Sequence, residues 1–465
     1  MSLIIQSYIH IYDIPQISHA SSSSWLHDKL RYPTFLRTDP SDELQAKFII
    51  QLASQLKIER LGLISSSSAW GKSGAASIQR YADRAGICLS YVYQVDRIEK
   101  SVIALVDDLM DKINADMRDG GGCRVPKPMV IFAEQGVLQT IFKQLSYRGN
   151  FLKNRGHLFI GVKNWANLYE VISGTEHVTL GSITFGLAEG MFNWTFNGEI
   201  DLENFLFCQT PNSNDFNPFF AKFWQDYFDC HLPKHYSYHR QECRAGMSIG
   251  RLREDHRFVQ QNQLDTEDLV AKRNAMAMLL FAYGIKDAIF DNCFKKNLTE
   301  CAMMIFISAQ GRKLLFQHME SALIPRNIHS TVRDLKLWDM YGNGVPSYTV
   351  YNIIDVGTNT ASYQKVFEIK NGTFHKQGQP IFYTGSSKSF QYNEPLCSHD
   401  PECIAKPIDT EELTQQVEDR AGVVPFASLP WMLPMMVCIL VVLSLCLMTM
   451  LVYVINKHSV SKQGE

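Results

Sequence analysis

Short apolar strands alternate with amphipathic helices from about residue 14 to residue 165. Helical spacing is clear after residue 70, where Ala75, Ile78 and Ala82 would share one helical face. This strand–helix–strand rhythm predicts an α/β fold with a parallel, doubly wound sheet. The predicted strands lie at 14–17, 61–64, 87–92, 129–133 and 158–160, and the predicted helices between them at 71–85, 101–117 and 138–145.

The remainder of the chain is less regular. At 465 residues it is too long for one ordinary core and long enough for two lobes with additional segments. Helices are predicted at 218–230 and 266–290, and the second is apolar around most of its circumference, which predicts burial on all sides. Residues 346–392 predict strands and hairpins, and residues 404–430 predict a mixed acidic stalk.

One segment is typical of a membrane span. Residues 431–455 are 25 positions without a formal charge, whereas a bilayer core needs about 20 apolar residues. Acidic residues precede the segment and Lys457 and Lys462 follow it, so we expect a single-pass plasma-membrane protein with its N-terminal region outside. Residues 1–12 lack the basic start and cleavage site of a signal peptide. We therefore expect either an incomplete chain or insertion directed by the late helix.

A domain outside the cell is expected to form disulfide bonds. The chain has 11 cysteines, and two of them fall inside the predicted span. Close spacing predicts the pairs Cys230–Cys243 and Cys293–Cys301. The pairing of the others stays open: Cys88, Cys123, Cys208, Cys397 and Cys403. Glycosylation sequons that agree with this topology occur at Asn193, Asn297 and Asn371.

Motifs for other chemistries are weak. Residues 246–250 match the nucleophile pattern of hydrolases, but no apolar strand precedes them, and an enzyme is not expected. Cysteines and histidines between Cys230 and Cys243 resemble a zinc cluster, yet an oxidising location favours a disulfide, so neither a metal nor a cofactor is expected. The formal net charge of -2 without a basic stripe makes nucleic acid an unexpected partner.

Two serine-rich turns come directly after predicted strands, at residues 21–24 and 65–68. Ligands of open α/β sheets bind beyond the carboxyl ends of the strands. Hydroxyl groups and helix-terminal amides at such places suit a carboxylate or another anion. Serine is equally common there as a plain helix N-cap, and the residues alone do not decide between the two roles.

Several separate motifs in one collinear order resemble the metabotropic glutamate receptors. IPQIS at 14–18 begins the resemblance, and AWGKSG at 69–74 stands where the family usually has NYGESG. Residues 217–230 are similar to the family's NPWF…FW…F-x-C helix, and both close cysteine pairs fall where the family has short disulfides. The resemblance covers roughly residues 10–400. It also includes Ala20, Ser21, Ser22, Arg31, Tyr32, Phe35, Arg37, Pro40, Asp42, Gln45, Ala46, Tyr351, Asn352 and 363–366.

The resemblance implies a two-lobed clamshell of the periplasmic-binding-protein type (type I), which closes on a ligand in its cleft. Within a binding region at 1–395, one lobe would take 1–38 and 191–345, and the other 39–190 and 346–395. Residues 396–430 would be a stalk with a remnant of the cysteine-rich module, and 456–465 a cytoplasmic tail. A homo- or heterodimer through the first lobe is implied in the same way. The family's opening strands, its further spans and the usual partner of Cys88 are missing from this sequence.

The resemblance also implies a ligand site. Ala20 and Ser22, with Ser21 between them, match the contacts to an amino acid's carboxylate and amine, and Asp42 matches the acidic residue that faces the ammonium. Trp70 replaces a stacking tyrosine, and Lys163 stands at a second acidic amine contact. Leu168 and residues 305–307 stand where the family has basic residues.

Lys163 changes what this site is expected to bind. Like charges about 4 Å apart repel by roughly 4 kcal/mol at an effective dielectric of about 20, which is about a thousandfold in affinity. We therefore expect Lys163 to pair with Asp42 in place of a ligand's ammonium, and glutamate to bind weakly or not at all.

The sequence favours a receptor module that binds a small, amino-acid-like ligand. Two alternatives stay open: a single-pass decoy or dimerisation partner without signalling, and an ectodomain of the guanylyl-cyclase or natriuretic-peptide type. A cleft blocked by Lys163 would favour the partner role, and an open polar cleft would favour ligand sensing. The ligand, the oligomeric state and whether the chain is a fragment of a seven-span receptor are not decided by the sequence.

Overall fold

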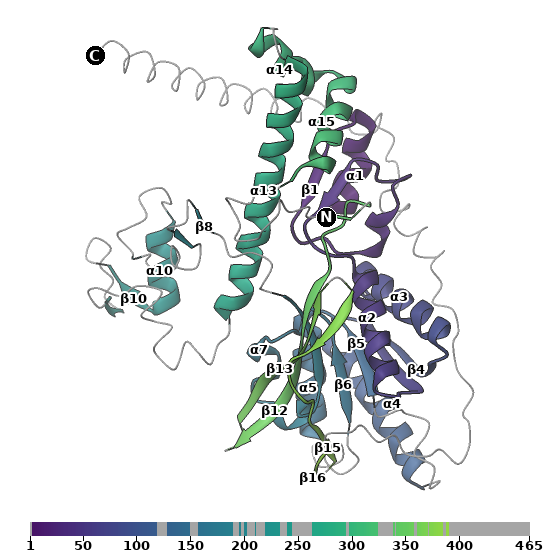
Figure 1. Cartoon of the computed structure of the whole chain (residues 1–465). Coiled ribbons are helices and arrows are strands. Elements are labelled where there is room, and N and C mark those ends of the chain that lie inside the picture. The colour runs from purple at the N-terminus through teal and green to yellow at the C-terminus, as the bar shows by residue number, and fades with distance from the viewer. Residues whose placement is uncertain are drawn as a thin grey trace. The chain divides into compact units, whose positions relative to one another are not determined.

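A computed structural model places the elements of the chain in space (Figure 1). The chain divides into two compact units, Met1–Ile408 and Asp409–Glu465. The predicted stalk, membrane segment and tail lie outside the described residues. Within the described part of the chain, no helix has both the length and the apolar character needed to cross a bilayer. The described residues are 2–118, 128–148, 157–188, 195–196, 200–201, 210, 219–232, 240–243, 263–293, 297–323, 338–339, 341–357, 360–370, 372–384 and 387–389.

An eight-stranded sheet has the order β14-β13-β12-β7-β6-β5-β3-β4. Its parallel part confirms the predicted alternation and consists of β3 (Arg60–Ser66), β4 (Cys88–Val95), β5 (Pro128–Phe132), β6 (Leu158–Gly161) and β7 (Ile183–Leu187). The other three strands extend the sheet in antiparallel fashion: β12 (Ser347–Gly357), β13 (Thr360–Lys370) and β14 (Thr373–Lys376). The sheet is therefore mixed, because the late strands join it as hairpins rather than through crossover helices.

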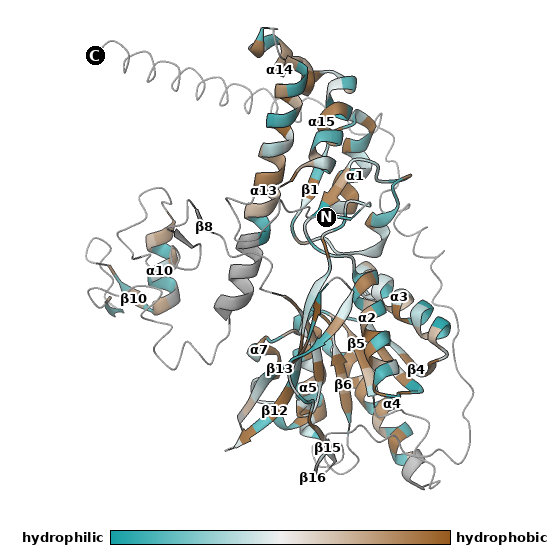
Figure 2. Cartoon of the chain, in the orientation of Figure 1, coloured by the Kyte–Doolittle hydropathy of each residue, from teal (hydrophilic) through white to brown (hydrophobic). Residues whose placement is uncertain are grey.

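Helices cover both faces of this sheet. In β5, Val130 and Phe132 face one core while Met129 and Ile131 face the other, so an apolar run without polar alternation fits a strand buried on both sides. Figure 2 shows the apolar colouring of these central strands and the two-sided colouring of the helices around them. The first core is closed by α2 (Asp42–Gln55) and α3 (Ala69–Ala85), and the second by α4 (Glu99–Arg118), α5 (Gln135–Tyr147), α7 (Tyr169–Ile172) and α8 (Glu176–Thr179).

Helix α3 lies close to the sheet at Gly74. Ser68 caps its start by accepting a hydrogen bond from the Gly71 amide at 3.1 Å, and Gly86 ends it with φ +70°. A Cβ atom on Gly74 would lie 2.1 Å from Cε1 of Phe132 in β5. The glycine thus sets how near the start of the helix approaches the ends of the strands.

Two parallel strands and a set of helices form the remainder of the main described structure. Strand β1 (Gln16–Ser18) pairs with β2 (Phe35–Arg37), and helix α1 (Ser2–Ile9) and two short 3-10 helices (His10–Tyr12 and Ser24–His27) flank them in sequence. Helices α13 (Gln263–Cys293), α14 (Leu298–Ile307) and α15 (Ala309–Ser321) pack around a third core. Shorter elements are α10 (Phe220–Phe228), β8 (Thr195–Phe196), β9 (Ile200–Asp201), β10 (Cys230–His231), β11 (Gln241–Glu242), β15 (Phe382–Thr384) and β16 (Ser387–Ser389).

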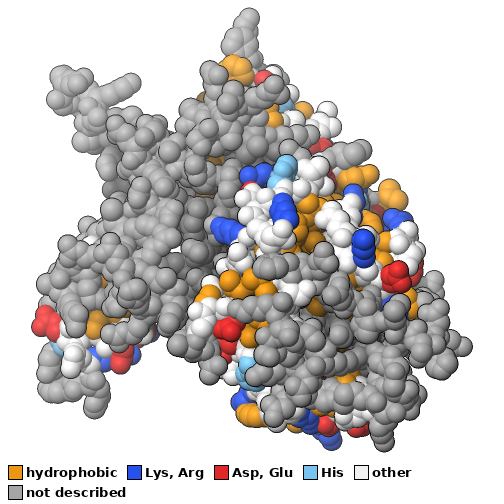
Figure 3. All heavy atoms as spheres, turned by 60° about the horizontal axis from the view of Figure 1, so that its bottom comes forward, with side chains coloured by type: hydrophobic (Ala, Val, Ile, Leu, Met, Phe, Trp, Pro, Cys, Tyr) orange, Lys and Arg blue, Asp and Glu red, His pale blue; other side chains and the backbone are white. Residues whose placement is uncertain are grey.

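The prediction that the helix at 266–290 is buried on all sides was wrong. Leu280 and Ala288 of α13 are fully buried, but Met278 and Phe290 are 70% and 71% exposed. The helix packs one face against α14 and α15 and leaves another face at the surface. Some of its apolar side chains are therefore exposed. On the view in Figure 3, the described surface mixes basic, acidic and apolar side chains, in keeping with the small net charge.

The structure contains the two close disulfide bonds suggested by spacing. Cys230–Cys243 and Cys293–Cys301 have Cα–Cα distances of 5.0 and 5.6 Å. The first bond removes both thiolates from the zinc-like cluster, and the second ties α13 to α14. The sequence left the pairing of Cys88 open; in the structure Cys88 is disulfide-bonded, and its partner lies outside the described residues. The hydrolase-like motif at 246–250 and the sequons at Asn193 and Asn371 also lie outside them.

The close approach of α3 to the sheet predicts opposite effects for two glycine substitutions. Gly74→Ala should lower the free energy of unfolding by about 1–3 kcal/mol, because the new methyl group must displace Phe132. Gly136→Ala in α5 should be neutral or raise it by up to about 1 kcal/mol, since nothing lies within 4 Å of that position. Chemical denaturation of the two variants measures both values, and equal stability would contradict the packing described.

Candidate functional site

A cavity of about 440 Å³ opens beyond the carboxyl ends of four parallel strands. Ser68 follows β3, Arg97 follows β4, Glu134 follows β5 and Lys163 follows β6, and all four side chains line the cavity. This is where ligands bind in open α/β sheets. The remaining lining comes from the serine-rich loop after β1 and from the beginning of α1: Ser2, Leu3, Ala20, Ser21, Ser22, Ser23 and Leu26, together with Ala69, Trp70 and Asn164.

The candidate binding residues from the sequence gather at this cavity. Ala20, Ser21, Ser22, Trp70 and Lys163 all line it, although they are up to 143 positions apart in the chain. Asp42 does not line it. The Asp42 side chain lies directly behind the wall and is only 1% exposed. Leu168 and residues 305–307 are not among the lining residues, so the two positions that are basic in the family contribute nothing to this wall.

The serine loop is held in place by the buried guanidinium of Arg37. Its Nη1 atom donates to the carbonyl oxygens of Ser21 and Ser23 at 3.1 and 2.7 Å. Its Nε and Nη2 atoms both donate to Oδ1 of Asn343, at 2.8 and 2.6 Å. Two further contacts fix the loop to helices, since the hydroxyls of Ser24 and Ser73 lie 2.6 Å apart and so do those of Ser2 and Ser21. The loop therefore offers its hydroxyls from a rigid backbone.

The Trp70 ring forms part of the opposite wall. It stands in the first turn of α3 and packs on Phe132 with ring centroids 4.5 Å apart. Its Nε1 atom donates to Oδ2 of Asp42 at 2.7 Å. An indole that is fixed on one face and hydrogen-bonded at its nitrogen can present only its remaining surface to a ligand.

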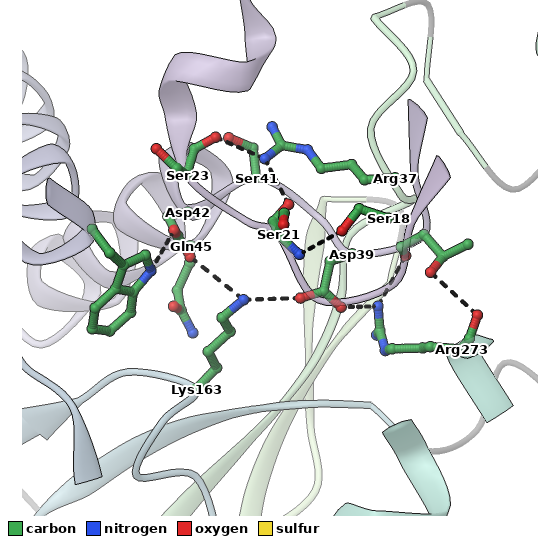
Figure 4. Close-up of polar contacts among 12 residues, drawn as sticks. Ser18, Ser21, Ser23, Arg37, Asp39, Ser41, Asp42, Gln45, Lys163 and Arg273 are labelled. Atoms are coloured by element: carbon green, nitrogen blue, oxygen red, sulfur yellow. Dashed lines mark hydrogen bonds and ion pairs between the residues drawn. The ribbon is translucent and has the colours of Figure 1, made fainter. Parts of the chain in front are cut away.

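Lys163 in the cavity's lining belongs to an ion-pair network centred on Asp39 (Figure 4). The Lys163 Nζ atom lies 2.9 Å from Oδ2 of Asp39 and 3.8 Å from Oδ1 of Asp42. From the other side, Nη1 of Arg273 in α13 donates to Oδ1 of Asp39 at 2.7 Å and to the carbonyl oxygen of Thr38 at 2.9 Å. The expected pairing of Lys163 with Asp42 is thus the longer of two contacts, because the nearer carboxylate is Asp39.

The two aspartates respond differently to this surrounding. Burial alone would raise the pKa of Asp39, but the charges of Lys163 and Arg273 outweigh it and hold that pKa below its usual value. Burial also dominates at Asp42, where the more distant Lys163, the Ser22 hydroxyl and Arg37 do not offset it, so the pKa of Asp42 is raised. Asp39 is therefore the firmly ionised member of the pair.

Besides Lys163, two charged side chains line the cavity, and neither was identified from the sequence: Arg97 and Glu134. Nη2 of Arg97 donates to Oε1 of Glu134 at 2.9 Å. Burial would raise the pKa of Glu134, but hydrogen bonds from Ser68, Arg97 and Ser66 lower it below the usual value. Each residue comes two positions after its strand ends, so the rule that ligand sites follow the carboxyl ends of strands would have pointed to both.

Comparison with known proteins places the chain among receptors. Residues 1–352 match the family model for the receptor family ligand binding region. The chain belongs to this family. Over 237 residues it is 27% identical to metabotropic glutamate receptor 4 of Macaca fascicularis and of Rattus norvegicus, a match covering 50% of this chain. The same match spans 24% of each relative's length. The resemblance read from the sequence motifs is thereby confirmed.

The buried network predicts a large loss of stability on neutralising Asp39. Asp39→Asn should lower the free energy of unfolding by about 3 kcal/mol near neutral pH, because Lys163 and Arg273 keep their charges in a buried place. Asp107→Asn, which removes the carboxylate from an exposed pair with Arg148, should cost at most about 1 kcal/mol.

The pH dependence of that loss has a defined sign. Because the folded pKa of Asp39 is depressed, its contribution is complete above the unfolded pKa of about 3.9 and disappears as pH falls through the lower folded value. The difference between wild type and Asp39→Asn should hence be constant above about pH 5 and shrink below about pH 4. Urea unfolding across this range measures it, and a difference that grew on acidification would contradict the assignment.

Proposed function

We propose that this chain is the ligand-binding part of a receptor related to the metabotropic glutamate receptors, and that it binds a small polar ligand in the cavity described. The observation that carries the proposal is the convergence of the serine loop, Trp70 and Lys163 on one cavity at the carboxyl ends of the strands. Family membership supports a receptor role, and the lining suits a ligand with at least one acidic group. The role is one of binding rather than catalysis.

The lining groups suit a carboxylate in particular. The hydroxyl groups of Ser21 and Ser23 can donate hydrogen bonds to an anion, and the first turn of α3 adds the positive end of a 17-residue helix. Lys163 adds a charge that water does not fully screen, since its side chain is 13% exposed. These groups come from both sides of the cavity.

A ligand in this position would favour closure. In our proposal the serine loop belongs to a lobe at 1–38 and 191–345, and Lys163 to a lobe at 39–190 and 346–395. A ligand that contacts both walls binds the closed arrangement more tightly, and so increases its population. The ligand's size is limited by a cavity of about 440 Å³, which suits an amino-acid-like molecule.

L-Glutamate itself is a poor candidate. Lys163 already lies between the cavity and Asp42, so an α-ammonium would meet a like charge before it met a carboxylate. The repulsion of roughly 4 kcal/mol expected at about 4 Å corresponds to about a thousandfold weaker binding. The proposal is thus a related receptor with a changed ligand.

The location and assembly of the chain are part of the same proposal. We place the chain at the plasma membrane as a single-pass protein with residues before 430 outside the cell, as a homo- or heterodimer through the first lobe. Coupling to G proteins would need the remaining length of the relatives, of which the match spans 24%. The ion pair that fills the ammonium's place also favours a second role, as a dimerisation partner without signalling of its own.

Filling the cavity tests the binding role. Ala20 is exposed and lines the cavity, so Ala20→Trp should block it without disturbing a core, whereas Ala85→Trp at the exposed end of α3 is a matched control. In thermal unfolding against a panel of L-amino acids and short dicarboxylic acids, at least one compound should stabilise wild type and Ala85→Trp but not Ala20→Trp. The gain should reach about 2.7 kcal/mol at a hundred times the Kd. Stabilisation of Ala20→Trp to the same extent would place the ligand elsewhere.

The location outside the cell can be tested at Asn297. Its side-chain Oδ1 accepts hydrogen bonds from the Thr299 and Glu300 amides and caps α14, while the residue itself is exposed. Thr299→Ala destroys the sequon and keeps this cap. We expect the variant, expressed in mammalian cells, to lose one glycosidase-sensitive mobility step relative to wild type, with Thr360→Ala, outside any sequon, as the control. Identical mobility of all three proteins would count against glycosylation at this position.

A further inference from the structure

The acidic groups around the cavity already have basic or donor partners. Asp39 is bonded by Lys163 and Arg273 at 2.9 and 2.7 Å. Glu134 is paired with Arg97 at 2.9 Å. Asp42 accepts from the indole of Trp70 and has the Lys163 ammonium at 3.8 Å. A ligand's ammonium would have to break one of these pairs before it gained a carboxylate of its own.

The lining of the cavity carries a surplus of positive charge. Among the described residues that line it, two side chains are basic and one is acidic, for a formal charge of +1: Arg97 and Lys163, and Glu134. A carboxylate is attracted by this balance. A positive group on the ligand's α-carbon is opposed by it.

A neutral hydroxyl in place of the amine fits the cavity better. An ammonium only donates hydrogen bonds, as does the ammonium of Lys163, so the two cannot bond to each other. A hydroxyl can accept from Lys163 while it donates to a serine oxygen of the loop. Replacing amine by hydroxyl therefore turns a repulsion into a hydrogen bond without changing the ligand's size.

We propose that the cavity selects carboxylic acids without an α-ammonium group, such as 2-hydroxy acids, over the matching α-amino acids, and that Lys163 sets this preference. The proposal rests on the proposed function, because it needs a small ligand in this cavity. It names the ligand's chemical class and the residue that enforces it.

An isosteric pair of ligands tests the proposal. L-2-hydroxyglutarate and L-glutamate differ only in the group on the α-carbon, and their Kd values for the purified chain can be measured by isothermal titration calorimetry. Wild type should bind the hydroxy acid more tightly by roughly tenfold or more. Lys163→Met should bring the ratio of the two Kd values towards one, and Lys112→Met, which removes a half-exposed lysine on α4, should leave the ratio unchanged.

The possible results separate the ligand selectivity, the role of Lys163 and the binding function itself. Equal or tighter binding of glutamate by wild type overturns the selection but leaves a small-ligand receptor in place. A ratio that Lys163→Met does not change shows that another residue sets the preference, and overturns the role of Lys163. If neither acid binds while another compound of the panel does, the ligand class is wrong and the binding function stands; if no compound binds, both are wrong. Should Lys163→Met fail to fold, the wild-type ratio alone still tests the selection.

Discussion

The carboxylate of Asp39 is the point on which the arrangement of the site depends. It follows strand β2, and it receives Lys163 from the end of β6 and Arg273 from α13. A buried carboxylate loses its hydration, and only close cations can offset that cost. Two cations at 2.7 and 2.9 Å give Asp39 more electrostatic stabilisation than one would. Three separate segments are thereby held together, and the place of Lys163 in the cavity's lining follows from this contact.

The network also determines what the cavity offers to a ligand. In the amino-acid site that the resemblance implies, an acidic side chain would face the ligand's ammonium. Here the ammonium of Lys163 is covalently part of the protein and already stands near Asp42. The serine loop, fixed by Arg37, still offers hydroxyl groups suited to a carboxylate. In our proposal the cavity can therefore bind an acidic group, while Lys163 occupies the place where an amine would be bound.

Local patterns in the sequence predicted the local parts of this structure. Apolar periodicity predicted the strands and helices between residues 60 and 161. The positions of the serines at 21–24 and 65–68, directly after predicted strands, predicted that they lie beyond the strand ends. The contacts that define the site are not local: Asp39 and Arg273 are 234 positions apart, and Asp39 and Lys163 are 124. No spacing rule links such residues, because only the folded chain brings them together. The exposed face of α13 was missed for a similar reason, since composition does not tell which apolar residues find partners.

The most direct measurement is a double-mutant cycle between Asp39 and Lys163. The free energy of unfolding is determined for wild type, Asp39→Asn, Lys163→Met and the double variant in urea at neutral pH. If the buried contact at 2.9 Å organises the site, the sum of the losses in unfolding free energy for the two single variants should exceed the loss for the double variant by about 1–3 kcal/mol. Losses that add to within about 0.5 kcal/mol would mean that the two residues act independently, and would contradict the account of the cavity given above.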